Sequence, residues 1–325
     1  MRRMGTSYWD YIRVEDLLGL QNGLEDDASK NSNHEILFIT VHQVFELWFN
    51  LVIREMVTLR DLFHQNPVPE EDMALAAHSA DRIITILGLA HDHFKVVETL
   101  NTRDYLDFRD KLFPASGFQS AQMRQIEILI GLDDDERVGL GSKAGYMKAL
   151  GGDIGDASPA LQRVMATKAD TPTLKDAVDE WLYRTPIRGS QPGDEGDEAV
   201  VDAFLDDYLA RYREATERLK AHVRATGGDV ADPDAFDTHY EREIESTAAF
   251  CRGADARERR IRASILFIES YRELPLLTGP RTVLSRMIAL EQALVMFRQR
   301  HARMVERVIG RRTGTGGSSG VDYLD

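Results

Sequence analysis

The chain has almost no cysteine, since Cys251 is the only one among its 325 residues. A single cysteine cannot form an intrachain disulfide, which is typical of proteins from a reducing compartment. Iron–sulfur clusters and cysteine-rich zinc sites are also excluded, because both need several thiolates. The sequence therefore predicts a protein with neither an intrachain disulfide nor a metal site built from several cysteines.

The chain also has fewer basic than acidic residues. The 40 lysines and arginines are outnumbered by 54 aspartates and glutamates, and the formal charge is −14. Nonspecific binding to nucleic acid or to an anionic membrane needs basic patches, so neither partner is expected. The N-terminus lacks the apolar core of a signal peptide, and no stretch reaches the roughly 18 uninterrupted apolar residues of a membrane span. We therefore expect a soluble, cytoplasmic protein.

Several motifs of metal and phosphate chemistry are missing. There is no H-E-x-x-H zinc motif, because His34 and Glu35 are followed by Ile-Leu-Phe, and there is no G-x-x-x-x-G-K-[ST] phosphate loop. Gly139-Leu140-Gly141 is only a weak match to a dinucleotide motif, since no strand precedes it. The sequence thus carries no recognisable phosphate-loop or zinc-protease chemistry.

The dominant pattern in the sequence is helical periodicity. Residues 35–64 are apolar around most of the circumference, which is typical of a helix in the middle of a bundle. The other predicted helices are 72–99, 103–112, 118–131, 198–223, 234–271 and 281–309. Alternating strand patterns with hairpin turns are absent, so the chain is predicted to be an all-α helical bundle, residues 1–325 forming a single domain. The Pro- and Gly-containing residues 184–198 are expected to be a solvated loop or insertion.

Two of the nine histidines are candidate functional residues. His42 lies inside the most apolar helix, where burying an imidazole costs free energy unless its nitrogens find partners. It is either a core histidine that is hydrogen-bonded to the backbone or to Glu46, or a side chain that faces a ligand. His301 lies in a helix with apolar Leu294 and Phe297 but is flanked by arginines, so on its own it resembles a surface histidine.

Two further segments admit more than one interpretation. The tract TGTGGSSG at residues 313–320 resembles a flexible linker, but closely spaced glycines also let the backbone approach a ligand, while Thr and Ser supply hydroxyls. Tyr105 and Arg109 are four residues apart, so a helix over 103–112 places them on one face, suited to clamping a carboxylate. An ion pair between Arg109 and an aspartate in solvent explains the same spacing.

Together these segments resemble one family, the tryptophan 2,3-dioxygenases. The matching motifs, in chain order, are H-E-I-L-F-I-T-V-H-Q from His34, E-L-W-F from Glu46, Y-L-D-F-R-D from Tyr105, P-A-S-G-F-Q-S from Pro114, R-Q-R-H ending at His301, and G-T-G-G-S-S-G from Gly314. They cover the N-terminal third and the C-terminal end of the chain. The region of about 135–275 carries no part of the resemblance.

The resemblance implies a helical homotetramer with one b-type haem per subunit and O2 as co-substrate. His301 would be the proximal ligand to the haem iron, and Ser116 and Gly117 would lie against the haem. His42 would lie on the distal side as the catalytic histidine and accept a hydrogen bond from the indole N–H.

The resemblance also implies a set of substrate contacts. Phe38 would pack on the indole ring, and Arg109 would bind the carboxylate with Tyr105 beside it. Thr315 would contact the ammonium and carboxylate from a Gly-rich loop that closes over the substrate. In a further contact, Tyr8, Tyr11 and Ile12 of the N-terminal segment 1–20 would reach into a neighbouring subunit's pocket.

The implied reaction adds both atoms of O2 across the indole C2–C3 bond of L-tryptophan, or of a substituted tryptophan, and gives N-formylkynurenine. One alternative is a related indole monooxygenase of secondary metabolism that gives an oxindole. The unusual N-terminal Tyr8-Trp9-Asp10-Tyr11 and the acidic insertion motivate it. Another alternative is a non-catalytic helical assembly protein without haem, in which the Gly-rich tract is only a linker.

Overall fold

A computed structural model of the chain describes residues 7–112, 119–132, 150–151, 158–226 and 233–309. Over these ranges the chain is helical without strands, apart from an isolated bridge between Ile187 and Ser190, so the all-α prediction is confirmed. The α-helices are α1 (Tyr8–Tyr11), α2 (Val14–Leu18), α3 (Asn33–His64), α4 (Glu70–Val97), α5 (Thr102–Leu106), α6 (Ala121–Leu129), α8 (Pro159–Ala169), α9 (Leu174–Arg184), α10 (Asp197–Thr226), α11 (Pro233–Arg252), α12 (Ala256–Ser270) and α13 (Thr278–Ile309). Short 3-10 turns cover Gly19–Gln21, Ala28–Lys30, Arg109–Leu112 and Pro275–Leu277.

The predicted helix over 234–271 is two helices, α11 and α12. Gly253 interrupts them with a φ of 63°, and a Cβ at this position would lie 2.8 Å from the backbone nitrogen of Arg259. Asp255 then caps α12, because its side chain accepts a hydrogen bond from the Glu258 N–H at 2.8 Å. The break therefore follows from a glycine and an N-cap that lie within an otherwise continuous helical pattern.

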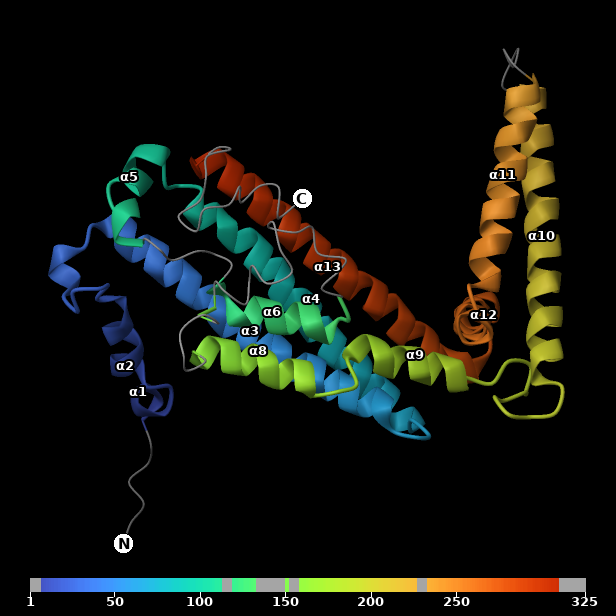
Figure 1. Cartoon of the computed structure of the whole chain (residues 1–325), viewed down its shortest axis with the longest axis horizontal. Coiled ribbons are helices and arrows are strands. Elements are labelled where there is room, and N and C mark those ends of the chain that lie inside the picture. The colour runs from blue at the N-terminus through green and yellow to red at the C-terminus, as the bar shows by residue number, and fades with distance from the viewer. Residues whose placement is uncertain (1–6, 113–118, 133–149, 152–157, 227–232, 310–325) are drawn as a thin grey trace, which may run out of the picture. The chain divides into compact units, whose positions relative to one another are not determined.

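The helices α8 and α9 were not predicted from periodicity. Their start carries a standard signal, since Ser158 accepts a hydrogen bond from the Leu161 N–H and Pro159 occupies the first turn. Leu161 and Val164 are buried in a small core with Ala121 of α6. Figure 1 shows α6 and α8 lying against each other, in agreement with their contacts.

The chain divides into two compact units. The first comprises residues 1–59, 76–174 and 286–325, and the second comprises residues 60–75 and 175–285. The helices α3, α4 and α13 each contribute residues to both units.

Aromatic side chains form the core of the first unit. Here α3, α4 and α13 run side by side (Figure 1), and their buried phenylalanines meet. The ring of Phe45 lies 4.8 Å from that of Phe94 and 5.9 Å from that of Phe297, and Phe49 packs edge-on against Phe297 at 5.6 Å. These contacts pack α3, α4 and α13 against one another next to the candidate histidines, because Phe45 lies one turn after His42 and Phe297 one turn before His301.

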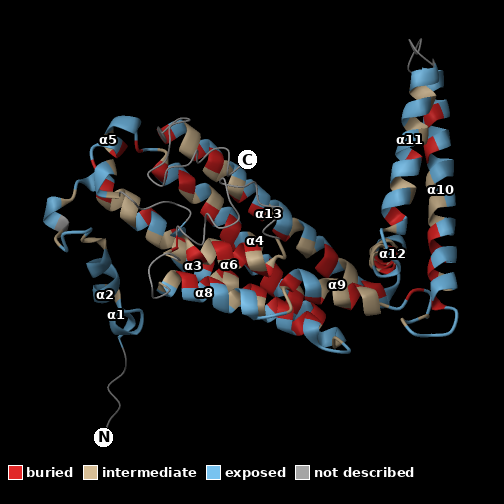
Figure 2. Ribbon diagram, viewed as in Figure 1, coloured by how far each residue is buried: buried red, intermediate tan, exposed pale blue. Residues whose placement is uncertain are grey.

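The second unit contains a helical hairpin made of α10 and α11, with α12 packed at its base. Val201, Phe204, Leu205, Cys251 and Ala263 form the apolar core at this base. Farther along the hairpin the two helices are exposed over most of their surface (Figure 2). Charged side chains hold them together there: Lys220 is buried among Glu217, Asp237 and Glu241, with the closest nitrogen–oxygen distance 3.1 Å to Glu217.

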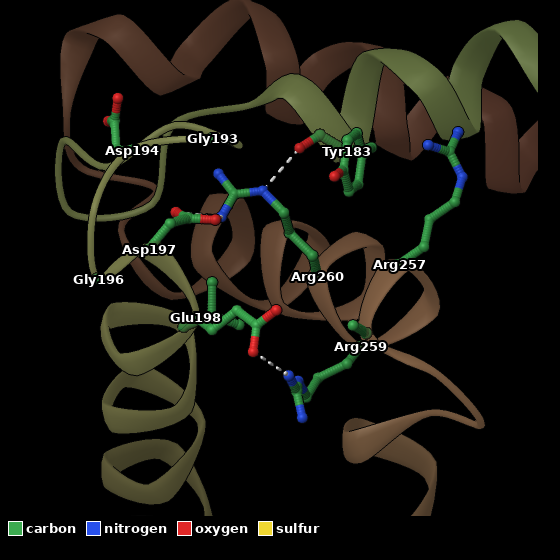
Figure 3. A pocket seen from close by; sticks show the side chains of 11 residues that line it. Tyr183, Gly193, Asp194, Gly196, Asp197, Glu198, Arg257, Arg259 and Arg260 are labelled. Carbon is green, nitrogen blue, oxygen red and sulfur yellow. Dashed lines mark hydrogen bonds and ion pairs between the residues drawn. The ribbon is translucent and has the colours of Figure 1, made fainter.

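Residues 184–198 connect α9 to α10 and are largely exposed, but Arg260 of α12 ties them down. Its Nη1 donates to both carboxylate oxygens of Asp197 at 2.6 and 2.7 Å, and its Nε donates to the Tyr183 carbonyl at 2.8 Å. Its Nη2 donates to the carbonyls of Thr185 and Ser190. Figure 3 shows the guanidinium enclosed by the loop. The buried Arg260 guanidinium therefore holds residues near both ends of the segment 184–198.

The helices α3 and α4 are long and apolar enough to cross a membrane on length and composition alone. Core helices of soluble proteins meet the same criterion, so two such helices are weak evidence for a membrane protein.

Candidate functional site

His301 lies in α13, one turn after Phe297, and its imidazole stacks on the ring of Phe94 from α4. The two ring centroids are 5.3 Å apart and the planes are inclined by 15°. Burial lowers the pKa of His301 to about 4, with a smaller contribution from nearby His42. No hydrogen bond to its ring nitrogens contributes to this shift. At neutral pH the chain thus presents a neutral imidazole, which is the form that coordinates a metal.

His42 lies in α3, and its Nδ1 is 2.7 Å from the carbonyl oxygen of Phe38. Because a carbonyl oxygen only accepts, Nδ1 carries the proton, and Nε2 of the neutral ring is left as an acceptor. Burial lowers the pKa of His42, although solvent still reaches part of the ring. Phe38 covers the ring at 4.1 Å and Phe45 lies 6.3 Å away, so protein surrounds the imidazole on one side and solvent reaches the other.

The second predicted cluster lies beside Phe38. The rings of Tyr105 and Phe108 are 6.1 and 5.5 Å from that of Phe38, and Tyr105 and Phe108 pack edge-to-face at 5.5 Å. Burial raises the pKa of the Tyr105 phenol, while a hydrogen bond from the Arg109 guanidinium opposes the shift. The guanidinium and the phenol therefore form one unit, next to the ring that covers His42.

The helix predicted over 103–112 is wrong in its length. It is helical only to Leu106, and Arg109 begins a 3-10 turn. Asn101 caps α5 by accepting from the Asp104 N–H, and the aspartates at 104, 107 and 110 favour caps and turns over a helix interior. Tyr105 and Arg109 nevertheless meet, because the tighter turn keeps both on the side that faces α3.

Two hydrogen bonds join α5 and α6 to the helices that carry His301 and His42. The Thr102 hydroxyl donates to the Val308 carbonyl at 2.7 Å, which joins the start of α5 to the last turn of the helix that carries His301. Gln122 of α6 donates at 2.7 Å to the Glu46 carboxylate, which lies one turn after His42 and raises its pKa.

His93 is a residue that the sequence did not single out. Its ring packs edge-on against Phe45 at 5.1 Å, and its charge contributes to the lowered pKa of His42. Its Nε2 is buried and has no hydrogen-bond partner among the described residues. The residue lies between Asp92 and Phe94 in a helix with polar neighbours, so no local pattern separated it from a surface histidine.

Three predicted residues, Tyr8, Tyr11 and Ile12, are not brought to this cluster. Ser116, Gly117 and Thr315 lie outside the described residues. Tyr8, Tyr11 and Ile12 are 76, 79 and 43% exposed, in a segment whose helices α1 and α2 bury no residue.

The comparisons with known proteins agree with this geometry. A family model described as tryptophan 2,3-dioxygenase matches residues 1–325. The chain belongs to this family. It is 52% identical to the tryptophan 2,3-dioxygenase of Sorangium cellulosum, over 98% of this chain and 78% of that protein, and 47% identical to tryptophan 2,3-dioxygenase 2 of Ralstonia nicotianae, over 98% and 88%. A tryptophan 2,3-dioxygenase of Anopheles gambiae is 31% identical over 98% of this chain and 80% of that protein. Tryptophan 2,3-dioxygenases are haem-dependent oxygenases of an indole amino acid, so the predicted enzyme class is confirmed.

The residues of the cluster fit the haem of a tryptophan 2,3-dioxygenase. Three features suit a single-histidine haem site: a neutral imidazole with no hydrogen bond to another described residue, a second imidazole that lowers its pKa, and aromatic side chains around both. Within the described residues there is no group of three or more His, Cys, Asp or Glu side chains that could hold a bare metal ion.

A pocket of about 410 Å³ lies elsewhere, in the second unit, and contains none of the predicted site residues. Tyr183, Arg257, Arg259 and Arg260 line it with acidic residues (Figure 3). The three arginines are paired with Glu180, Asp202 and Asp197 respectively, so the pocket offers no free cation to a ligand.

Proposed function

We propose that the chain is a tryptophan 2,3-dioxygenase that binds one b-type haem per subunit through His301. The observation that carries the proposal is the pairing of two neutral imidazoles, on α3 and α13, beside a joined Tyr105–Arg109 unit. The family supplies the reaction, and we assign His301, His42 and Arg109 to its parts.

When bound, the haem supplies the activation of O2 that addition to the indole ring requires. Burial keeps the His301 imidazole neutral, so this residue would be available to hold the haem iron. Its stacking on Phe94 orients the ring. An oriented imidazole would hold the group better than one that rotates freely.

The indole would lie against Phe38, with its N–H directed to Nε2 of His42. The hydrogen bond from Nδ1 to the Phe38 carbonyl supports this assignment, because it selects the tautomer in which Nε2 accepts. The same bond orients the imidazole from its own helix. His42 thus acts on the substrate by accepting a hydrogen bond, without needing to become charged.

The amino-acid end of the substrate would be bound by Arg109. A guanidinium binds a carboxylate bidentately, and its hydrogen bond to Tyr105 holds it in place beside Phe38. Thr315, Ser116 and Gly117 remain predicted contacts of the substrate and the haem.

Two further expectations accompany the proposed function. We expect a homotetramer in which Tyr8, Tyr11 and Ile12 complete a neighbouring copy's pocket, because these apolar side chains are left exposed in the single chain. We also expect one haem domain that acts in the cytoplasm without a nucleic-acid or membrane partner.

The proposed function is tested by reconstituting the protein with haem. The unaltered protein should show a Soret band and form N-formylkynurenine from L-tryptophan. His301→Ala should lose the Soret band, whereas Arg109→Ala should keep it and bind L-tryptophan at least a hundredfold more weakly. A Soret band of full strength in the His301→Ala protein would contradict the ligand assignment.

The same assay separates the monooxygenase alternative. With isotopically labelled O2, a product that carries two labelled atoms indicates dioxygenation, and an oxindole with one labelled atom indicates monooxygenation. The relatives named tryptophan 2,3-dioxygenase favour the former. A well-folded protein that cannot take up haem would support the non-catalytic alternative.

A further inference from the structure

Residues 7–21, called the N-terminal arm below, lie almost entirely in solvent. Every residue from 7 to 20 is exposed except Val14, which is partly buried. The arm bends between α1 and α2 at Arg13, whose φ of 54° is unusual for a residue other than glycine. Its internal contacts are short-range, such as the hydrogen bond of 3.1 Å from Trp9 to Glu15. The arm therefore has no core of its own to hold it in place.

Among the described residues, the Gln43 amide is the one side chain outside the arm that hydrogen-bonds to it. Nε2 of Gln43 in α3 donates to the Leu20 carbonyl at 2.8 Å, and its Oε1 accepts from Nε2 of Gln21 at 2.7 Å. Among the described residues, the other hydrogen bonds and ion pairs of the arm stay within it. Both functional groups of the Gln43 amide are thus used to hold the end of the arm.

Gln43 is also the residue next to His42. Consecutive side chains of an α-helix point about 100° apart, so neighbouring residues of α3 face different parts of the structure. His42 faces the aromatic rings of Phe38 and Phe45, while Gln43 faces the arm. The peptide unit between His42 and Gln43 therefore links a subunit's own candidate site to the base of its arm.

We propose that Gln43 is a positioning residue that holds the arm in the direction from which it completes a neighbouring copy's substrate pocket. The inference rests on the proposed function, in which Tyr8, Tyr11 and Ile12 contact substrate in the neighbour. Gln43 of one copy therefore acts on substrate binding in another copy, and not on its own pocket.

The first test measures the arm directly. In Gln43→Ala, both hydrogen bonds are lost, which shifts the equilibrium toward a released arm by roughly tenfold or more. Amide hydrogens of residues 8–21 should then exchange with solvent about tenfold faster, with the Soret band unchanged. Gln125→Ala is the matched control, because it removes an amide–hydroxyl hydrogen bond to Thr167 in the same unit without touching the arm. Equal exchange in both variants would overturn the proposal.

The second test measures substrate binding. Gln43→Ala should raise KM for L-tryptophan several-fold and change kcat less, because the arm shapes the pocket without entering the chemistry. Gln21→Ala removes part of the attachment from the arm side and should raise KM in the same direction. It keeps the proposal testable if Gln43→Ala folds poorly. A normal KM in Gln21→Ala, together with faster exchange of its arm, would overturn the role in the pocket.

The third test decides which copy is affected. Gln43→Ala subunits, which keep an intact pocket, are co-expressed with Arg109→Ala subunits, which keep a held arm. Mixed oligomers, isolated with two different tags, should regain a component of activity with the KM of the unaltered protein. Activity with only the raised KM would show that Gln43 acts on its own pocket, and would overturn the proposal. Failure of the proposed function looks different, because the unaltered protein would then lack turnover while the exchange result still holds.

Discussion

Replacing Arg260 is the sharpest test of how the second unit is held together. Its side chain is 4% exposed and that of Asp197 is 11% exposed, so the pair is shielded from solvent. The guanidinium also donates to the carbonyls of Tyr183, Thr185 and Ser190. Arg260→Ala leaves a buried carboxylate without its cation and removes one donor from each of three carbonyls, of which that of Ser190 still accepts from the Ile187 N–H. Removing one partner of a buried ion pair costs about 3–5 kcal/mol, which is a large fraction of the stability of a typical protein.

Two comparison variants separate the causes. Arg260→Lys keeps the charge but cannot reach four acceptors from one planar group, so we expect a loss of about 2 kcal/mol. Arg257→Ala, the matched control, removes a side chain that is 49% exposed and paired with Glu180, and should cost about 1 kcal/mol or less.

Stability is measured by urea unfolding followed by circular dichroism, with hydrogen exchange of residues 184–198 as the local readout. Exchange is needed because a chain with two compact units need not unfold in one step. The Soret band of the haem-loaded protein should persist in Arg260→Ala at neutral pH, since the histidine cluster belongs to the first unit. If Arg260→Ala cost no more than Arg257→Ala, the argument from the buried ion pair would be refuted.

Three further predictions concern single side chains. His42→Ala should retain haem and form product more slowly, and loss of the Soret band in this variant would reverse the proximal and distal assignments. Tyr105→Phe should weaken L-tryptophan binding about fivefold, because one hydrogen bond that holds Arg109 is lost, and isothermal titration of the haem-loaded protein checks this. The pKa of Asp237 lies below its usual 3.8, mainly because Arg224 hydrogen-bonds to it. The hairpin is therefore stabilised above about pH 4 and should lose that stabilisation as the pH falls further, whereas Asp237→Asn should show no such acid-dependent loss in hydrogen exchange of α11.

Helix positions were predictable wherever an apolar stripe recurs over several turns. The prediction of 35–64 matches α3 within two residues, because a continuous apolar surface over that length has no other favourable fold in a chain without strands. The prediction failed at Gly253 and at residues 107–108, where a single glycine or a few aspartates change the backbone without changing the hydrophobic period. It also missed α8 and α9, although the apolar residues of α9, from Leu174 to Leu182, recur at helical spacing.

The residues of the candidate site could be predicted from the sequence, whereas their contacts with one another could not. The motifs around His42, Arg109 and His301 indicated the family, and the family assigned each a role. Nothing in the local sequence indicates that Phe94 stacks on His301, or that His93 has a buried nitrogen without a partner beside Phe45. These facts depend on helices that are distant in the chain, since α4 and α13 are separated by most of the second unit.

What the sequence determines by itself is therefore the class of structure and the list of reactive groups. Composition excludes an intrachain disulfide and sites that need several cysteines, periodicity requires helices, and the spacing of the motifs identifies the family. The tertiary structure alone decides the chemical state of those groups. The pKa of His301 falls to about 4 because burial withdraws water from its ring, which stacks on Phe94, although arginines flank it in sequence. Likewise, Gln43 became a candidate positioning residue only when α3 and the N-terminal arm were placed within hydrogen-bonding distance. Solvation and distance are properties of packing, and no local pattern of residues encodes them.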